Sequence, residues 1–404
     1  MKKMVIFGAG RIGRSFIGQI FSRGGYEVVF VDVDHRLIDL LNKHKCYKII
    51  IKGESDDILS IRNVRGIPFE NTVQILKELS NTTISAVSVG QSALPSVIPV
   101  IAKCLKQRAD SDNPIPLDII LAENMRDAAG HFRDELYVLL GKEFPLGKMA
   151  GLIETSIGKM VPFMTKEDLQ QDPLQIFAEP YNTLILDKKA FLNPIPDIPW
   201  LAPQENMKAW VDRKSFIHNL GHATAAYTGF LKNPGKIFLY EVLDDPEIFQ
   251  VARQTMQQSS SILMKIHPGE FTTEDLDAHI DDLLARFRNK ALRDTILRVG
   301  CDLMRKLGLE DRLVAPITEA MQSGLPYDRI LYALVCGFYF RAKDEAGKFH
   351  PSDLKFYENF KPDIGYLLTR FCGLDPTKNK KLFSQAKEFC IEINHRYNPA
   401  VKIV

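Results

Sequence analysis

The sequence lacks an excess of charge of one sign and lacks a long hydrophobic run. Its 404 residues carry 52 basic and 50 acidic side chains, a formal net charge of +2. A dedicated nucleic-acid or anionic-membrane surface needs a clear basic excess. The longest apolar run, 331–340, is about half of the roughly 20 residues that span a bilayer. Arg11 interrupts the apolar segment that follows Lys2 and Lys3, so a signal peptide is disfavoured. We expect a cytoplasmic protein without nucleic-acid or membrane partners.

Cysteine is scarce, and its spacing indicates neither a disulfide framework nor a metal site. The six cysteines include no Cys-x-x-Cys pair. Neither they nor the nine histidines cluster as the ligands of a catalytic zinc do. With 45% hydrophobic residues, the chain can bury a large core without cross-links. We therefore expect thiols of a reducing compartment and no bound metal.

The first half of the chain alternates strand-like and helix-like segments. This alternation predicts an α/β fold with a doubly wound sheet. The segments that we interpret as strands are 4–7, 27–31, 47–51, 58–61, 84–89, 117–121 and 150–154. Helical periodicity lies between them, at 12–22, 36–43 and 97–105.

A glycine-rich turn follows the first predicted strand and opens a helix. It consists of Gly8, Ala9, Gly10, Arg11, Ile12 and Gly13. In a dinucleotide fingerprint the first glycine permits the tight turn, the second lets the backbone approach the pyrophosphate, and the third lets the helix pack on the strand. Asp32 ends the second strand, where a carboxylate accepts both ribose hydroxyls and repels a 2′-phosphate. The pattern predicts NAD rather than NADP, although Arg36 lies nearby. The alternative is a structural turn without nucleotide.

Prolines accumulate at positions 194, 196, 199 and 203. A helix cannot cross such a segment, and we place a domain boundary there. Beyond it the periodicity is helical, at 207–231, 246–266, 274–288, 290–305, 328–342 and 382–397. We predict an NAD-binding Rossmann-type domain over 1–200 and a mostly α-helical substrate and catalytic domain over 201–404.

A nicotinamide-dependent enzyme needs a group that exchanges the substrate proton. Tyr357-x-x-x-Lys361 matches the short-chain dehydrogenase pattern, but it lies far beyond any Rossmann strand and we interpret it as chance. At about 100° per residue, Lys214, Asn219 and His222 share one side of the predicted helix 207–231. His218 falls in the same arc, so spacing does not choose between the two histidines. A solvated polar face explains the same spacing.

The pattern Lys-x5-Asn-x2-His at Lys214, Asn219 and His222 resembles the mannitol dehydrogenase family, the polyol-specific long-chain dehydrogenases that work without metal. The surrounding residues are most similar to its mannitol-1-phosphate 5-dehydrogenase branch. Further similar segments, which spread the resemblance over nearly the whole chain, are 8–18, 122–125, 311–314 and 324–326.

The resemblance implies a role for each matching residue. Lys214 would be the general acid/base, Asn124 and Asn219 would hold the reacting oxygen, and His222 would orient the substrate hydroxyls. A lysine needs a pKa well below about 10.4 to act near neutrality. Burial beside Arg213 and a cationic nicotinamide ring lowers the pKa in that direction.

Two segments depart from the pattern. Gly158 and Lys159 stand where the family usually has an Asp-Arg pair, so a carboxylate contact is missing. The segment from Arg341 to Lys348 is more similar to the longer mannitol 2-dehydrogenase and hexuronate reductase branches. As candidate phosphate ligands we take Arg213, Lys159, Arg341 and Lys348, for each of which a solvated surface role is the alternative.

The resemblance implies an NAD-dependent oxidoreductase that interconverts a sugar-alcohol phosphate and a ketose phosphate, namely mannitol 1-phosphate and fructose 6-phosphate. One alternative substrate is an unphosphorylated polyol, and another is a hexuronate such as fructuronate or tagaturonate. A catalytically silent NAD-binding regulator is a third and more remote reading.

Overall fold

The computed structural model describes residues 2–53, 55–123, 125 and 127–404, and it separates into two compact units, Met1–Val211 and Asp212–Val404. The first unit is a Rossmann-type α/β sheet and the second consists mostly of helices. The predicted fold class is therefore confirmed. Past residue 200, strand β11 (Leu201–Gln204) and most of helix α8 (Met207–Arg213) group with the first unit.

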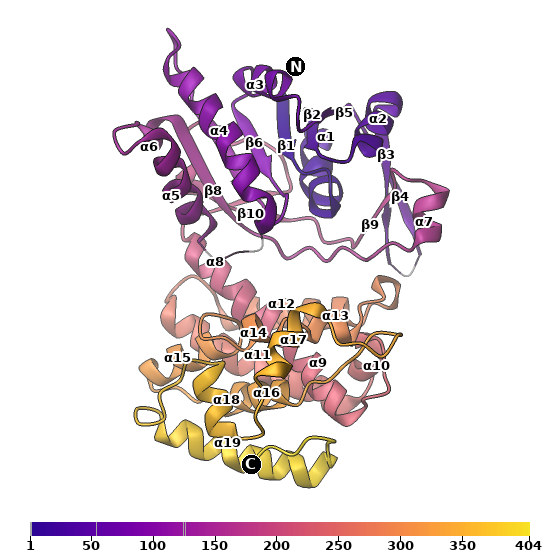
Figure 1. Cartoon of the computed structure of the whole chain (residues 1–404), viewed down its shortest axis with the longest axis vertical. Helices are drawn as coiled ribbons and strands as arrows, with labels where there is room; N and C mark the ends of the chain where they lie inside the picture. The colour runs from indigo at the N-terminus through magenta and orange to yellow at the C-terminus, as the bar shows by residue number, and fades with distance from the viewer. Residues whose placement is uncertain (1, 54, 124, 126) are drawn as a thin grey trace. The chain divides into compact units, whose positions relative to one another are not determined.

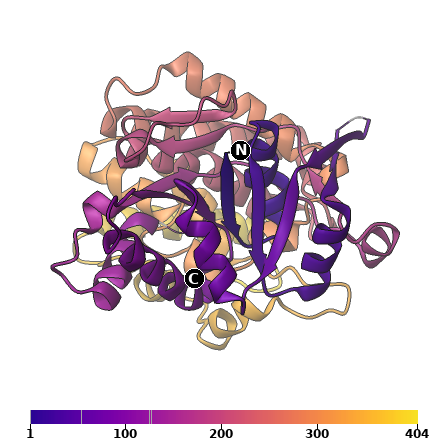
Figure 2. The same ribbon diagram turned by 90° about the horizontal axis from the view of Figure 1, so that it is seen from above.

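An eight-stranded sheet forms the frame of the first unit (Figures 1 and 2). Its order is β11-β10-β8-β7-β6-β1-β2-β5. The remaining bounds are β1 (Lys3–Phe7), β2 (Glu27–Asp32), β5 (Val64–Pro68), β6 (Ile84–Val87), β7 (Leu117–Leu121), β8 (Ala150–Ser156) and β10 (Leu184–Asp187). The strands from β8 to β5 pair in parallel, whereas β10 runs antiparallel to β8. The carboxyl ends of the parallel strands therefore meet at one edge, where such sheets bind ligands.

Apolar residues fill both faces of this sheet. Along β1, Met4 and Ile6 pack in one core, while Val5 and Phe7 pack in the other. This alternation follows from the two-residue period of a strand and explains why the run is apolar throughout. Helices α3 (Thr72–Ser80), α4 (Leu94–Ala109) and α5 (Ala128–Leu140) supply residues to the second core, and Figure 1 shows α4 and α5 alongside β6 and β8.

The predicted strands at 47–51 and 58–61 do not join the main sheet. They are β3 (Cys46–Ile51) and β4 (Asp57–Arg62), which pair antiparallel, and β3 also pairs with β9 (Ile176–Ala178). Strand β5, which flanks β2, was not predicted because Gly66 and Pro68 hide its short apolar pattern.

The proline-rich segment holds no helix, as predicted. Pro203 lies within β11, the edge strand of the sheet. An edge position tolerates proline because one side of the strand makes no ladder hydrogen bonds.

Helix α9 (Leu220–Lys232) packs against four other helices of the second unit: α10 (Leu239–Leu243), α11 (Pro246–Ile266), α13 (Ile296–Gly300) and α16 (Asp328–Phe338). Small residues allow the close packing, since a Cβ on Gly221 would lie 2.4 Å from the Met256 sulfur. The long helices α12 (Thr273–Phe287) and α19 (Lys380–Tyr397) lie near their predicted positions.

Two predicted helices of this half are wrong as continuous α-helices. The segment 290–305 is broken at Arg293 and Asp302, which have φ of 48° and 71°. It forms a 3-10 turn η5 (Lys290–Leu292), α13 and the start of α14 (Leu303–Lys306). The segment 207–231 contains a π-helical turn, η4 (Lys214–Asn219), between α8 and α9. In the described part of the chain, no helix has the length and apolar character to cross a membrane.

Candidate functional site

The glycine turn of the first unit has the geometry of a dinucleotide loop. Gly8 has a φ of 96°, and a Cβ there would lie 2.5 Å from the Ser88 carbonyl oxygen. A Cβ on Gly13 would lie 2.0 Å from the Gly8 carbonyl oxygen, so the turn itself requires both glycines. A Cβ on Gly10 would have no described atom within 4 Å. Gly10 therefore leaves space at the start of the helix, where first-turn N–H groups point outward and bind phosphate.

Asp32 connects the second strand to the glycine turn. Its Oδ2 accepts a hydrogen bond from the Ala9 N–H at 2.6 Å, and its Oδ1 accepts one from the Asp34 N–H at 3.0 Å. An ionised carboxylate has about four acceptor sites, so two ribose hydroxyls can still bind. Arg36 is exposed at the start of helix α2 (His35–His44). The Asp32 position therefore fits an unphosphorylated ribose.

Arg14 secures the turn from behind, a role that the sequence did not indicate. Its Nε donates to the Ala9 carbonyl and its Nη1 donates to the Leu174 carbonyl, each at 2.7 Å. Burial lowers the pKa of this arginine. Arg11 is exposed and lies 4.1 Å from the Phe163 ring centroid, while Ile12 packs partly on the core. Arg14 follows the fingerprint in a π-helical turn, η1 (Gly13–Gly18), which turns its side chain inward.

Glu123 joins the ends of β6 and β7. Its Oε1 accepts hydrogen bonds from Val89 N–H at 2.8 Å and from Gly90 N–H at 3.1 Å. Burial raises the pKa of the Glu123 carboxyl. Asn124, the next residue and a predicted ligand of the reacting oxygen, lies outside the described residues.

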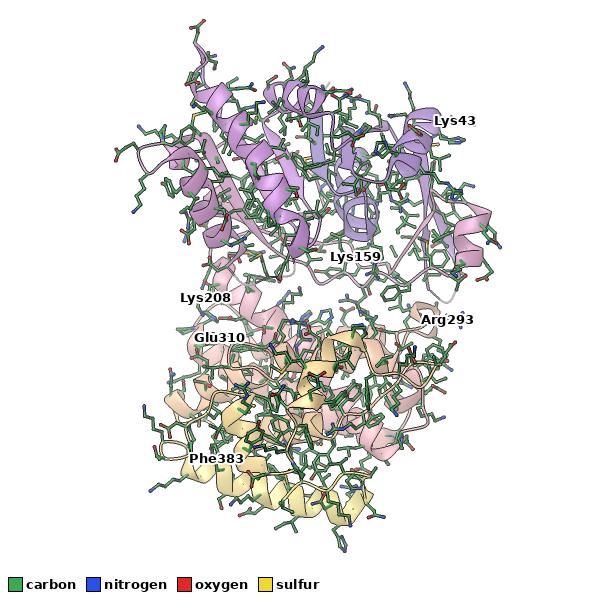
Figure 3. The ribbon with its side chains drawn as sticks, in the orientation of Figure 1. Lys43, Lys159, Lys208, Arg293, Glu310 and Phe383 are labelled. Carbon is green, nitrogen blue, oxygen red and sulfur yellow. The ribbon has the colours of Figure 1, made fainter. Side chains whose placement is uncertain are left out.

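Lys159 is buried after β8, next to the π-helical turn η1 (Figure 3). Its ammonium donates to the Tyr181 carbonyl at 2.7 Å and to Asn182 Oδ1 at 3.2 Å. It also lies 5.4 Å from the Phe16 ring centroid. These contacts hold the segment after β9 against η1, and the predicted phosphate contact of Lys159 stays a prediction.

In the second unit, Lys214 and Asn219 begin and end the π-helical turn η4. The Leu220 N–H reaches the Ser215 carbonyl, five residues back, in place of the four-residue step of an α-helix. The angular positions that assume a regular helix therefore do not hold across this turn. π-bulges within α-helices occur frequently at functional sites. Asn219 is half-buried at the end of the turn.

The ammonium of Lys214 lies in a positive environment. Burial, followed by the charges of Arg312 and Arg305, lowers its pKa to about 8, against the opposing charge of Asp311. Asp311 binds both arginines, since its Oδ1 accepts from Arg312 Nε at 2.7 Å and its Oδ2 accepts from Arg305 Nη1 at 2.8 Å. In Figure 3 the label of Glu310, the residue before Asp311 in the chain, marks this part of the second unit. Lys214 is thereby suited to exchange a proton near neutral pH.

Two histidines and one phenylalanine form a ring cluster. The His222 ring stacks on Phe287, with centroids 4.2 Å apart and planes within 5°. The His218 ring centroid lies 5.5 Å from that of Phe287 and 5.8 Å from that of His222. Burial lowers the pKa of both histidines. Both are therefore neutral at pH 7.

Lys306 is a further buried lysine, and the sequence did not indicate it. Its Nζ donates to the Val299 carbonyl at 2.6 Å. Burial, followed by the charge of Arg312, lowers its pKa to about 7. It lies one residue past the predicted helical segment 290–305 and belongs to no motif that would single it out.

The other predicted cationic ligands have varied surroundings. The Arg213 guanidinium lies 5.8 Å from the Phe271 ring centroid. Arg341 lies 4.3 Å from the Phe360 ring centroid and donates to the Phe340 carbonyl at 2.7 Å, and Lys348 is exposed. The Tyr357 hydroxyl also donates to the Phe340 carbonyl, at 3.1 Å, which gives that tyrosine a structural contact. In the described ranges, no three His, Cys, Asp or Glu side chains form a group that could hold a metal ion.

Two family models match consecutive parts of the chain. The mannitol dehydrogenase Rossmann domain matches residues 2–200, and the mannitol dehydrogenase C-terminal domain matches residues 206–364. The chain belongs to the mannitol dehydrogenase family. The first match contains the glycine turn and Asp32, and the second contains Lys214, His222 and Arg341.

Solved structures share the fold of this mannitol dehydrogenase family member. One is the Pseudomonas fluorescens mannitol 2-dehydrogenase in a ternary complex with NAD and D-mannitol, at 17% identity and a TM-score of 0.76, which covers 96% of this chain and 91% of that chain. Another is a D-sorbitol dehydrogenase in substrate-free form, at 16% identity and a TM-score of 0.78, with 97% and 93% covered.

Proposed function

We propose that the protein is an NAD-dependent dehydrogenase that oxidises a secondary hydroxyl of a sugar-alcohol phosphate and reduces the corresponding ketose phosphate. The observation that carries the proposal is the position of Lys214 at the start of the π-helical turn η4. There, burial and the charges of Arg312 and Arg305 together lower its pKa to about 8. A buried lysine without a chemical role costs stability, because its charged form loses hydration. Such a perturbed group within a dehydrogenase family is a candidate general base.

NAD is the cofactor in this proposal. Gly8, Gly10 and Gly13 would hold the pyrophosphate against the first helical turn, and Asp32 would accept the ribose hydroxyls. The required absence of a side chain at Gly8 and Gly13, and the open space at Gly10, support the fit. When bound, NAD supplies the acceptor for the hydrogen and two electrons that leave the substrate carbon.

Lys214 has the central role among the residues of the chain. Its neutral amine takes the proton of the substrate hydroxyl during oxidation, and its ammonium returns a proton to the carbonyl oxygen during reduction. The amide groups of Asn219 and Asn124 donate to the reacting oxygen and stabilise its developing negative charge. His222 binds a neighbouring hydroxyl and orients the substrate.

Mannitol 1-phosphate and fructose 6-phosphate are the proposed substrate pair. The similarity of the segment around Lys214 to the mannitol-1-phosphate branch supports a phosphorylated substrate. Arg213, Lys159, Arg341 and Lys348 are the proposed phosphate ligands. An unphosphorylated polyol is the second candidate, since the similar Pseudomonas fluorescens enzyme binds D-mannitol.

An assay panel tests the proposal. It compares mannitol 1-phosphate, mannitol, sorbitol, fructuronate and tagaturonate, each with NAD or NADP in the matching redox state. We expect mannitol 1-phosphate to exceed mannitol in kcat/KM by at least about two decades, because a charge-assisted phosphate contact is worth several kcal/mol. Comparable kcat/KM values for mannitol 1-phosphate and mannitol would reject the proposal that the substrate carries a phosphate. If the protein turns over none of these compounds but still binds NADH, the alternative of an NAD-binding regulator is favoured.

A further inference from the structure

His222 and Asp294 form a buried pair in the second unit. His222 lies on α9, whereas Asp294 lies in the break between η5 and α13, directly after Arg293 (labelled in Figure 3). The His222 Nε2 lies 3.2 Å from Asp294 Oδ2. Both residues are about nine-tenths buried, so water does not screen the pair.

Further contacts fix the positions of the His222 and Asp294 side chains. Phe287 stacks on the imidazole at 4.2 Å and limits the orientation of its plane. The Arg298 guanidinium donates to both carboxylate oxygens of Asp294 through Nε and Nη2. The Asp294 backbone carbonyl accepts the Leu239 N–H at 2.8 Å, which anchors the segment to α10. The position of both side chains is fixed by contacts that do not involve the imidazole proton.

The imidazole is nevertheless incompletely bonded. Nε2 is buried and, despite its distance to Asp294, makes no hydrogen bond of normal angle with the described residues. Buried polar groups almost always have a partner. A small rotation of the ring would direct an Nε2–H at Oδ2, and a ligand would complete the bonding at Nδ1.

In this pair the Asp294 carboxylate is ionised, whereas the His222 imidazole is neutral. Burial raises the pKa of Asp294, but His222 and Arg298 outweigh it and hold that carboxyl ionised. Burial lowers the pKa of His222, and the positive charges of Arg298 and Lys306 lower it further, against the opposing effect of Asp294. His218, the neighbouring histidine whose ring centroid lies 5.8 Å from that of His222, is also neutral. The imidazole therefore carries one proton and faces one anion.

We infer that Asp294 is a positioning residue that fixes the proton of His222 on Nε2 and leaves Nδ1 as a hydrogen-bond acceptor. A neutral imidazole donates from one nitrogen and accepts at the other. A carboxylate facing Nε2 selects the tautomer with the proton there, as the aspartate of a Ser-His-Asp triad does for its histidine.

The inference deepens the proposed function and rests on it for the substrate. An accepting Nδ1 binds a substrate O–H but not a carbonyl oxygen or a fluorine at the same position. His222 thereby selects a polyol hydroxyl next to the reacting carbon. Asp294, by fixing the tautomer, determines that selection without touching the substrate.

Nuclear magnetic resonance of the full-length protein with ¹⁵N-labelled histidine reads the tautomer directly. A His222→Gln variant assigns the signals, and His218 is the internal reference. We expect Nε2–H for His222 in the wild type. In Asp294→Asn the amide can donate to Nε2, so we expect the proton to move to Nδ1. Asp294→Glu restores the wild-type tautomer, and Arg298→Gln, which removes only the far partner of the carboxylate, retains it.

Kinetics supply the second arm. Asp294→Asn should raise the KM for the polyol about tenfold, the size of one lost hydrogen bond, with kcat changed less and NADH affinity unchanged. A wild-type His222 protonated on Nδ1, or a tautomer unchanged in Asp294→Asn, would overturn the inference. If no polyol is turned over while the tautomer behaves as expected, the proposed function fails and the positioning by Asp294 stands. If Asp294→Asn does not fold, the inference is tested by the His222 tautomer measured in the wild type and in Asp294→Glu.

Discussion

The Oδ2 of Asp32 accepts the N–H of Ala9 at 2.6 Å, so the carboxylate that selects the ribose in our proposal also fixes the glycine turn that would hold the pyrophosphate. The two parts of the fingerprint are thus one hydrogen-bonded unit. A substitution at Asp32 therefore affects both the shape of the turn and the recognition of the ribose, and substitutions that separate the two effects are informative.

Asp32→Ala should raise the KM for NAD far more than it lowers kcat, and it should narrow the preference for NAD over NADP. The loss of two charge-assisted ribose contacts corresponds to about 1.5–3 kcal/mol each. Asp32→Asn keeps an acceptor for Ala9 N–H but loses the charge, so it should narrow the preference with a smaller effect on the KM for NAD.

Asp34→Ala is the matched control for Asp32. Asp34 caps α2 by accepting the Leu37 N–H at 3.0 Å. Its loss should cost about 1 kcal/mol of stability and leave the KM for NAD unchanged. A wild-type enzyme that prefers NADP would refute the assigned role of Asp32.

Gly10→Ala and Gly13→Ala should affect different properties, namely NADH binding and stability. Gly13→Ala places a Cβ 2.0 Å from the Gly8 carbonyl oxygen, and we expect it to lower the free energy of unfolding by about 3 kcal/mol or more. Gly10→Ala meets no described atom and should fold normally, but it should weaken NADH binding at least tenfold, because its methyl group fills the space for the pyrophosphate. Denaturant unfolding and NADH fluorescence titration measure the two effects. If Gly10→Ala binds NADH with normal affinity, the pyrophosphate does not bind in the space next to Gly10.

Arg312→Gln should move the pH dependence of the reaction upward. Arg312 is the largest charge effect on the pKa of Lys214, after burial, and it lowers that pKa. Its removal also leaves Asp311 with one cationic partner fewer, which raises the pKa of Lys214 further. The inflection of kcat/KM for polyol oxidation should therefore lie above about 8 in the variant. Arg298→Gln, which does not act on Lys214, should leave the inflection in place.

Much of the fold follows from local sequence, whereas the site depends on departures from regular structure. Strands β1, β2 and β7 and the glycine turn were predicted within a residue or two, because buried parallel strands have continuous apolar runs and the turn has steric requirements. The π-helical turn at Lys214 was not predicted, because five-residue hydrogen bonding has no compositional pattern of its own. Asp294 was missed for the same kind of reason, since it lies in a break that the helical periodicity of 290–305 conceals.

Lys214→Ala tests the proposal at its centre. If Lys214 is the general base, the variant should lose about 10² to 10⁴ in kcat while it stays folded and binds NADH. The pKa of about 8 gives the sign of the wild-type pH dependence. Oxidation needs the neutral amine, so its rate rises with pH through about 8, whereas reduction needs the ammonium and falls over the same range. Lys214→Ala should lose this ionisation.

Small primary amines should restore part of the Lys214→Ala rate, because they fill the cavity and act as bases. The histidine variants provide the contrast. His222→Ala should raise the KM for the polyol and retain the inflection near pH 8, since His222 is neutral over that range. His218→Ala should retain it as well, since the His218 pKa lies well below its ordinary value. If instead Lys214→Ala kept near-native turnover and either histidine variant lost the ionisation, a histidine would be the base.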